Sequence, residues 1–236
     1  MPIYKIADLD IKINPVYDYV KEILSPYMCD SLNFDFEVKF SRMDIIEHAN
    51  EFDNEFSLGY YENSMILDSV YKTILEKYDG FFFHSSCLAI DNKACAFTAP
   101  SGTGKSTHTA LWRNMLGSKV VMINDDKPII RKKDGVFYAY GTPWMGKSGI
   151  GNNIKVPLKA VFILKRNEEN RVMKVSPSKV IKELLEAAMI DSDRQMVTNL
   201  LELINDFLGR VTVFELFCNK DIEAAKTAYD AFCEIE

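Results

Sequence analysis

The sequence predicts an α/β protein with a mixed β-sheet flanked by helices and a small α+β segment at its N-terminus. Three observations predict this class: apolar residues that alternate with period two, apolar residues at helical spacing, and a glycine-rich turn that joins a strand pattern to a helical pattern. The chain has 236 residues and is 47% hydrophobic, which is enough for one compact domain with a small extension.

The N-terminal part contains two clear elements. Residues 34–40 alternate apolar and polar side chains, as a strand with one buried face does. Residues 63–78 carry apolar side chains three and four positions apart, which predicts an amphipathic helix, and Asp79-Gly80 ends it. We therefore predict an N-terminal segment at residues 1–79 and a second, larger domain at residues 80–236.

The second domain begins with a predicted hairpin, in which residues 81–90 and 94–98 flank a turn at Asp91-Asn92-Lys93. Short apolar or alternating runs predict further strands at 119–123, 136–140, 159–164, 171–175 and 211–217. Helical spacing predicts helices at 178–190, 194–208 and 221–232. This domain is therefore predicted to contain both strands and helices.

The run from Ala99 to Ser106 matches the phosphate-binding pattern GxxxxGK[ST], except that Ala99 replaces the first glycine. Glycines allow backbone amides to turn inward around phosphates, and the following helix directs its positive end at them. An ordinary glycine-rich turn is the alternative, but a strand pattern precedes the run and a helical pattern follows it. The residues that we expect to contact the phosphates of ATP are Ser101, Gly102, Thr103, Gly104, Lys105, Ser106 and Thr107.

Two carboxylates follow the next predicted strand, at Asp125 and Asp126. Ligands bind at strand ends in open α/β sheets, and adjacent carboxylates permit one to organise Mg²⁺ while the other accepts a proton from an attacking hydroxyl. A solvated turn is the alternative, and the preceding phosphate-loop pattern favours the site. The spacing does not decide which aspartate takes which role.

One of the three histidines is a candidate site residue. If Ile90 pairs with Ala94, His84 lies opposite Pro100 at the start of the loop, close to the acidic pair. A satisfied structural histidine is the alternative. His108, in the helix after the loop, is expected to face away.

Composition excludes several partners. A net charge of −6 offers no basic surface for nucleic acid, and no stretch approaches the roughly 20 apolar residues of a membrane span. The N-terminus lacks the apolar core of a secretory signal, and five cysteines without a CxxC pair predict reduced thiols. We therefore expect a cytoplasmic protein. The sequence leaves open whether it forms a homo-oligomer.

His84, the run Ser-Gly-Thr-Gly-Lys-Ser and Asn124-Asp125-Asp126, in this order and spacing, resemble the catalytic domain of HPr kinase/phosphorylase. That domain shares its core with phosphoenolpyruvate carboxykinase. With Leu111-Trp112 and the run Tyr-Gly-Thr-Pro-Trp at 140–144, they are similar to bacterial HPr-kinase-like proteins, some of which are associated with modification of ribosomally made peptides. The resemblance covers about residues 80–235.

This resemblance implies that Lys105 binds the phosphates, Ser106 and Asp125 hold Mg²⁺, and Asp126 accepts the proton, supported by His84. The sequence departs from the family at residues 137–142, where the family glutamate of the metal site is missing. The reverse, phosphorolytic reaction and HPr as the substrate are therefore not carried over. Residues 141–153 lie where the family contacts the acceptor or phosphates, although a plain connection fits them equally, and either Arg166 or Arg171 is placed to reach the phosphates.

The sequence thus predicts an ATP-dependent kinase whose acceptor is a Ser or Thr hydroxyl of a peptide or protein. Two alternatives stay open: a kinase of a small hydroxylated metabolite, and a nucleotide-binding regulator that transfers nothing. Residues 47–55 and Tyr60-Tyr61 either bind the acceptor or merely cover the sheet, and the sequence favours the covering role.

Overall fold

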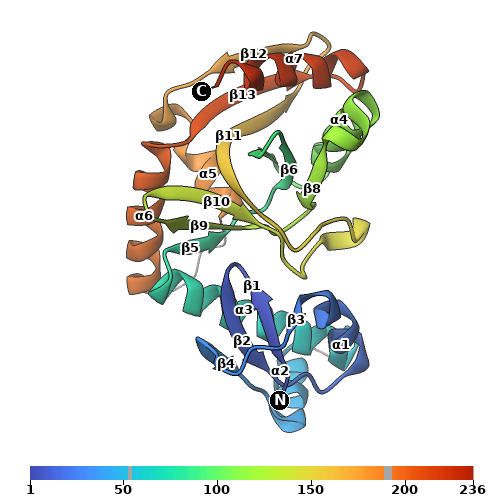
Figure 1. The fold of residues 1–236 in the computed structure, drawn as a ribbon, viewed down its shortest axis with the longest axis vertical. Helices are drawn as coiled ribbons and strands as arrows, with labels where there is room; N and C mark the ends of the chain where they lie inside the picture. Colours follow the sequence, from blue (N-terminus) through green and yellow to red (C-terminus); the bar gives the residue numbers. More distant parts are fainter. Residues whose placement is uncertain (53–54, 189–192, 236) are drawn as a thin grey trace. The chain divides into compact units, whose positions relative to one another are not determined.

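The structure, a computed structural model, describes residues 1–52, 55–188 and 193–235 and divides into two compact units, Met1–Lys77 and Tyr78–Glu236. Sequence patterning had placed the division after residue 79. Each unit builds its own β-sheet, and Figure 1 traces both along the chain.

The N-terminal unit has a four-stranded sheet in the order β3-β1-β2-β4. Its elements are β1 (Ile3–Ile6), β2 (Leu9–Ile13), α1 (Asp18–Leu24), η1 (Ser25–Tyr27), β3 (Met28–Cys29), β4 (Phe36–Val38), α2 (Arg42–Glu51) and α3 (Leu58–Lys77). The strand predicted at 34–40 is reduced to β4. The hairpin of β1 and β2 was not predicted, because its turn uses Ala7 and Asp8, which both take positive φ angles without a glycine.

Buried polar contacts fix this unit internally. Ser41 and Asp44 form a capping box at the start of α2. Glu62 of α3 is buried, and its two carboxylate oxygens accept hydrogen bonds from the N–H groups of Val16 at 2.6 Å and Tyr17 at 2.9 Å. The carboxylate therefore ties α3 to the segment that leads into α1.

The second unit is built on a nine-stranded mixed sheet. Its path runs β5-β9-β10-β11-β7-β6-β8, and β13 pairs with β11 and β12. β11 runs parallel to β7 and β13, and the other pairings are antiparallel. Its strands are β5 (Gly80–Phe82), β6 (Ser86–Ile90), β7 (Lys93–Thr98), β8 (Val121–Asn124), β9 (Ile129–Lys133), β10 (Val136–Tyr140), β11 (Lys155–Arg166), β12 (Arg171–Lys174) and β13 (Thr212–Cys218).

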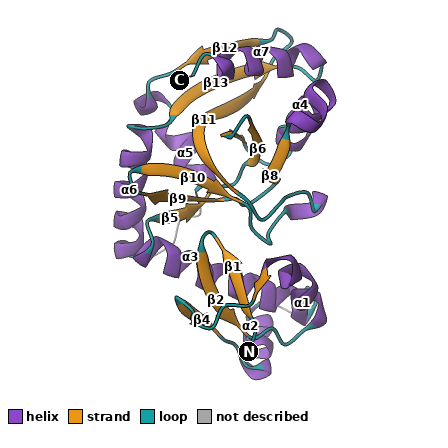
Figure 2. Cartoon of the chain, in the orientation of Figure 1, coloured by secondary structure: helices purple, strands orange, loops and turns teal. Residues whose placement is uncertain are grey.

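Helices cover this curled sheet, as Figure 2 shows. They are α4 (Lys105–Leu116), η2 (Gly117–Lys119), η3 (Gly146–Ser148), η4 (Pro177–Lys179), α5 (Ile181–Ala187), α6 (Arg194–Leu208) and α7 (Ile222–Cys233). α4 and α7 pack together through Trp112, whose ring contacts Tyr229 and Phe232, while Phe207 of α6 packs on Phe81 and Phe137. Trp112 also contacts Phe97, so the buried core joins α4 to β7, the strand before it.

Two predictions in the second unit were wrong in detail. The predicted strand at 81–90 is broken into β5 and β6, because β5 pairs with β9 whereas β6 pairs with β7 and β8. The hairpin turn contains only Asp91 and Asn92, both with positive φ, so Ile90 pairs with Lys93 and not with Ala94. β9 was missed altogether.

The helix predicted at 178–190 is shorter, with α5 at Ile181–Ala187, and its predicted end at 189–190 lies outside the described residues. The helix predicted at 194–208 coincides with α6. All five cysteines are free, with Cys87 and Cys95 buried. Across the described ranges, no helix combines the length and the apolar character that crossing a membrane would take.

Candidate functional site

A glycine-rich loop at residues 99–104 joins β7 to the first residue of α4. Gly102 and Gly104 have φ angles of 76° and 123°, a region that side chains rarely allow. A Cβ atom added at either glycine would meet nothing within 4 Å. These glycines are therefore required by the backbone conformation and not by close packing.

Lys105 is the first residue of α4 and is only 8% exposed. Its Nζ donates a hydrogen bond to the carbonyl oxygen of Ala99 at 2.9 Å, so the side chain folds back over the loop. Burial lowers the pKa of Lys105, and the charges of Asp126 and Asp125 partly oppose that shift. A partly desolvated ammonium at the positive end of a helix makes a local site for an anion.

Arg166, at the end of β11, holds the loop from its other side. Its Nε donates to the carbonyl oxygen of Thr103 at 3.2 Å and its Nη2 donates to that of Gly102. The Thr103 carbonyl and the Gly104 N–H belong to one trans peptide, in which the two groups point to opposite sides. Because Arg166 binds the carbonyl, the N–H of Gly104 points away from Arg166. Of the two arginines left open by the sequence, Arg166 reaches the loop, whereas Arg171 lies over the ring of Phe217 at 4.3 Å.

The acidic pair follows the end of β8, so strand alternation does not force the two side chains to opposite faces. The buried side chain of Asn124 fixes this turn. Its Oδ1 accepts from the N–H groups of Asp126 and Lys127, both at 2.8 Å, and its Nδ2 donates to the carbonyl and hydroxyl oxygens of Thr142, both at 3.0 Å.

Asp125 is buried and connects the acidic turn to α4. Its Oδ1 accepts a hydrogen bond from Ser86 Oγ, which also lies 2.9 Å from Thr109 Oγ1. Its backbone N–H donates to the carbonyl oxygen of Ile150 at 3.1 Å. Within the described part of the chain its Oδ2 has no hydrogen bond, which leaves one carboxylate oxygen available to a ligand.

The side chain of Asp126 is 20% exposed and lies between the ammonium group of Lys127 and the imidazole of His84. Its Oδ2 pairs with Lys127 Nζ at 2.6 Å, and its Oδ1 lies 3.4 Å from His84 Nε2. Burial lowers the pKa of His84, the charges of Lys105 and Lys127 lower it further, and Asp126 partly opposes them. The imidazole is therefore neutral at neutral pH and can share a proton with Asp126.

His84 reaches the acidic pair from the break between β5 and β6. The predicted position opposite Pro100 is wrong, because the shifted register ends the β6–β7 ladder at Ser86. Instead, the N–H of His84 donates to the carbonyl oxygen of Ala187 at 2.7 Å and its own carbonyl accepts from Thr98 Oγ1 at 3.0 Å. These contacts fix the backbone that carries the imidazole.

The second glycine-containing loop, residues 141–153, packs tightly behind the acidic pair. A Cβ atom at Gly141 would lie 1.7 Å from the carbonyl oxygen of Asn152, and one at Gly151 would lie 3.0 Å from a carbonyl oxygen of β8. At Gly146, where φ is 64°, a Cβ atom would lie 2.8 Å from Cβ of Asp126. This loop is a packed support for the carboxylates and not merely a connection.

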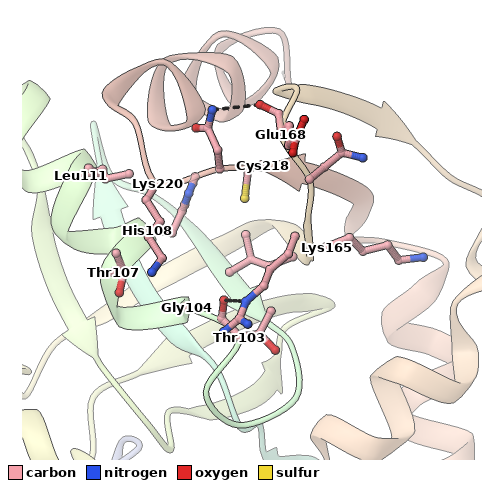
Figure 3. A pocket seen from close by; sticks show the side chains of 13 residues that line it. Thr103, Gly104, Thr107, His108, Leu111, Lys165, Glu168, Cys218 and Lys220 are labelled. Atoms are coloured by element: carbon pink, nitrogen blue, oxygen red, sulfur yellow. Dashed lines mark hydrogen bonds between the residues drawn. The ribbon is translucent and has the colours of Figure 1, made fainter.

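A cavity of about 520 Å³ opens beside the glycine-rich loop (Figure 3). Gly104 and the first turns of α4 form one wall, and the ends of β11 and β13 form the other. Its apolar lining includes Leu111, Leu164 and Cys218. Small organic ligands bind in cavities of this size and character.

His108 lies in the wall of this cavity, so the prediction that it faces away was wrong. The side chain is 3% exposed, and its Nε2 accepts a hydrogen bond from Trp112 Nε1 at 3.1 Å. The ring proton is therefore on Nδ1, which is buried without a partner within the described chain. Burial lowers the pKa of His108 to about 4, so the ring is neutral at neutral pH.

The structure thus brings His84 to 3.4 Å from Asp126 and places Lys105 where the charges of Asp125 and Asp126 act on it. The predicted hydroxyl ligands Ser101, Ser106 and Thr107 lie exposed on the loop and the first turn of α4. Sequence reasoning missed the supporting residues Ser86, Thr109 and Asn124. Thr109 had a usable signal, because it lies one helical turn after Lys105.

The donor set suits magnesium better than a transition metal. Within the described ranges no three His, Cys, Asp or Glu side chains gather into a metal cluster. Mg²⁺ is usually bound by one or two carboxylates together with water and substrate phosphates, so it needs no such cluster. The free Oδ2 of Asp125 and the exposed hydroxyl of Ser106 fit that pattern.

Comparison with known proteins gives a family. The sequence matches the model of the family described as SynChlorMet cassette protein ScmC over residues 53–220. No curated protein matches it. Among solved structures, the chain is similar to one titled "Structure of the Hpr(Ser) kinase/phosphatase from Coxiella burnetii", with a TM-score of 0.35 and 10% identity, over 65% of this chain and 97% of that chain.

Proposed function

The chain belongs to the family described as SynChlorMet cassette protein ScmC, whose description names no reaction, and from the geometry of the site we propose that it is an ATP-dependent kinase. It transfers the γ-phosphoryl group to a Ser or Thr hydroxyl of a peptide or protein. The observation that carries the proposal is the buried chain of contacts from Asp125 through Ser86 to Thr109. It ties the acidic turn at the end of β8 to α4, the helix that begins with Lys105. The second unit is then the catalytic domain, with a phosphate-loop core of the HPr kinase type.

The nucleotide is proposed to lie along the loop and the cavity. The phosphates meet the loop amides and Lys105, which exchanges its hydrogen bond to the Ala99 carbonyl for the terminal phosphates. The nucleoside enters the cavity of about 520 Å³, which adjoins the loop at Gly104. All of the residues in this proposed placement belong to the second unit.

Asp125 and Ser106 are proposed to hold Mg²⁺. When bound, the ion would neutralise charge on the β- and γ-phosphates. Asp125 suits this role because Ser86 and the backbone of residue 150 fix its carboxylate, and one oxygen stays free. Its burial leaves Asp126 as the carboxylate that an acceptor can approach.

Asp126 is proposed to take the proton of the acceptor hydroxyl. The hydroxyl oxygen forms a bond to the γ-phosphorus, the bond from that phosphorus to the bridging oxygen of ADP breaks, and the proton passes to Asp126. His84, neutral and 3.4 Å away, shares that proton and orients the carboxylate. Lys127 pairs with the other oxygen of this carboxylate and helps to hold it in place.

Transfer of labelled phosphate from ATP to pools of Ser- and Thr-containing peptides tests the proposal. We expect Asp126→Asn to reduce transfer at least about a thousand-fold, because the change removes both the general base and its negative charge. The affinity for ATP should stay within about two-fold of the wild type. Asp134→Asn, at an exposed turn of the same unit, is the matched control and should behave as the wild type. Normal transfer by Asp126→Asn would refute the assigned base, and transfer only to small hydroxylated metabolites would refute the acceptor class.

A further inference from the structure

A group of aromatic rings lies exposed on the N-terminal unit, where α2 ends and α3 begins. Phe52, Phe56 and Tyr60 are 54%, 53% and 45% exposed. All three surround the buried ring of Tyr61, with centroid distances of 6.3, 6.2 and 6.2 Å, and His48 contacts Tyr61 at 6.0 Å. We call Phe52, Phe56, Tyr60 and His48 the aromatic face.

This clustering distinguishes the aromatic face from the ordinary surface. Single exposed apolar side chains are common, whereas a contiguous exposed group marks an interaction site. Phe56 and Tyr60 contact each other at 4.6 Å, and both contact the buried ring of Tyr61, so the rings are already clustered. A partner that covers them therefore gains apolar burial with little ordering of this surface.

The aromatic face is also strongly acidic. The sequence contains no Lys or Arg between Arg42 and Lys72. Within this stretch Glu47, Glu51 and Glu55 are exposed, and Glu51 lies 3.5 Å from His48. Glu47 and Glu51 are four residues apart on α2, so they share one face of that helix. The whole unit has 15 acidic and 7 basic side chains, a net charge of −8.

Charge and aromaticity together select one class of partner. Carboxylates repel anionic lipid surfaces and nucleic acids, and they attract lysine and arginine. Ring faces bind the same cations, and arginine most often. A peptide segment that alternates basic and apolar side chains would satisfy the carboxylates and cover the rings at once.

We propose that the aromatic face, with Glu47, Glu51 and Glu55, binds a peptide segment rich in arginine or lysine and interspersed with apolar side chains. The segment is the docking part of the acceptor, a role that rests on the proposed function, whereas the binding itself does not require transfer. Docking away from the phosphorylated hydroxyl raises the local concentration of the acceptor.

Fluorescence anisotropy with the full chain tests the binding. The probe is a short fluorescein-labelled peptide of alternating arginine and leucine, compared with one in which glutamate replaces arginine and one in which serine replaces leucine. We expect the arginine–leucine peptide to bind at least about ten-fold more tightly than either, a difference of about 1.4 kcal/mol. Its binding should weaken as salt is added.

Two double variants locate the site. Phe56→Ala with Tyr60→Ala removes the exposed rings, and Glu51→Lys with Glu55→Lys reverses the charge; each should weaken binding about ten-fold or more. The matched control, Asp30→Lys with Leu32→Ala, removes an exposed acid and an exposed apolar side chain elsewhere in the unit and should leave binding unchanged. Circular dichroism confirms that each variant is folded.

Each outcome decides the proposal. Equal binding of the glutamate peptide, unchanged binding by either double variant, or equal weakening by the control would overturn it. Calorimetry with ATP and Mg²⁺ on the same proteins separates the two proposals: loss of peptide binding with ATP binding intact supports docking at this face. If ATP fails to bind while the peptide still does, the kinase assignment fails and the docking surface stands.

Discussion

The two glycine-containing loops of the second unit use the same residue for opposite reasons. In the loop at 99–104, Gly102 and Gly104 take positive φ angles in open space, where an added Cβ would touch nothing. In the loop at 141–153, Gly141 leaves only 1.7 Å between an added Cβ and a backbone oxygen. Gly102 and Gly104 are needed for their conformation, whereas Gly141 is needed for close contact, although Gly149 of the second loop also takes a positive φ in open space.

This difference separates the candidate site into an open part and a tightly packed part. We call the loop at 99–104 with Lys105 the phosphate side, and Asp125 and Asp126 with the loop at 141–153 the acidic side. On the phosphate side, Gly102 and Gly104 have open space beside their backbone, and Lys105 can exchange its hydrogen bond to the Ala99 carbonyl for a ligand. The acidic side is packed from behind, so Asp125 and Asp126 are held in place before any ligand arrives. Positioned carboxylates suit proton transfer, in which small displacements are costly.

The largest expected effect tests the packed loop. Gly141→Ala places a methyl group 1.7 Å from the carbonyl oxygen of Asn152, so one of the two backbone segments must move. We expect a loss of more than about 4 kcal/mol in the free energy of unfolding, measured by urea denaturation. A loss of less than about 1 kcal/mol would show that this loop is as open as the other.

The next effect tests the helix beneath the phosphate side. Burial lowers the pKa of His108 to about 4. Below about pH 6.5, His108 therefore binds a proton in the unfolded chain but not in the folded chain. Stability is therefore complete above that pH and falls as the pH drops towards about 4, by about 3 kcal/mol. Urea denaturation at several pH values should show that the unfolding free energy of His108→Gln depends less on pH than that of the wild type. An equal pH dependence in the two proteins would show that His108 is not the group responsible.

A smaller effect on stability, with a large effect on activity, is expected at Gly146. Gly146→Ala strains a φ angle of 64° and pushes a methyl group against Asp126. We expect a loss of about 2 kcal/mol in unfolding free energy. Transfer should fall at least about ten-fold with unchanged ATP affinity, because the change lies on the acidic side. Weakened ATP binding would show that the two sides do not act separately.

The smallest effect on stability is expected at Gly102. Gly102→Ala strains the φ angle of 76° without a clash, at a cost of about 1 kcal/mol. Calorimetry should detect weaker ATP binding, because the loop amides no longer turn inward together. Gly149→Ala, also at positive φ and in open space, is the control for strain alone and should leave ATP binding unchanged. An equal loss of ATP affinity in Gly149→Ala would show that the loop at 99–104 has no special role in ATP binding.

Local patterns predicted much of the second unit. The helix at 194–208 and the strand at 136–140 follow from periodicity, and the glycine-rich run followed by Lys105 marked the loop and the helix after it. The placement of the acidic pair at a strand end followed from the apolar run before Asn124.

The predictions failed where distant strands pair or where a turn adopts an unexpected conformation. The break that carries His84 exists because β5 pairs with β9, a contact that no local pattern records. The hairpin register was wrong because Asp91 and Asn92 both adopt positive φ, which shortens the turn by one residue. The supports of Asp125 and Asp126, such as Ser86, become visible only when β6, β8 and α4 are brought together.

Isothermal titration calorimetry with ATP and Mg²⁺ on the wild type, Asp126→Asn and Lys105→Ala tests the central claim most directly. The account predicts magnesium-dependent binding by the wild type and by Asp126→Asn, and a loss of at least about ten-fold in affinity for Lys105→Ala. Absence of binding by the wild type, or equal affinity in Lys105→Ala, would contradict it.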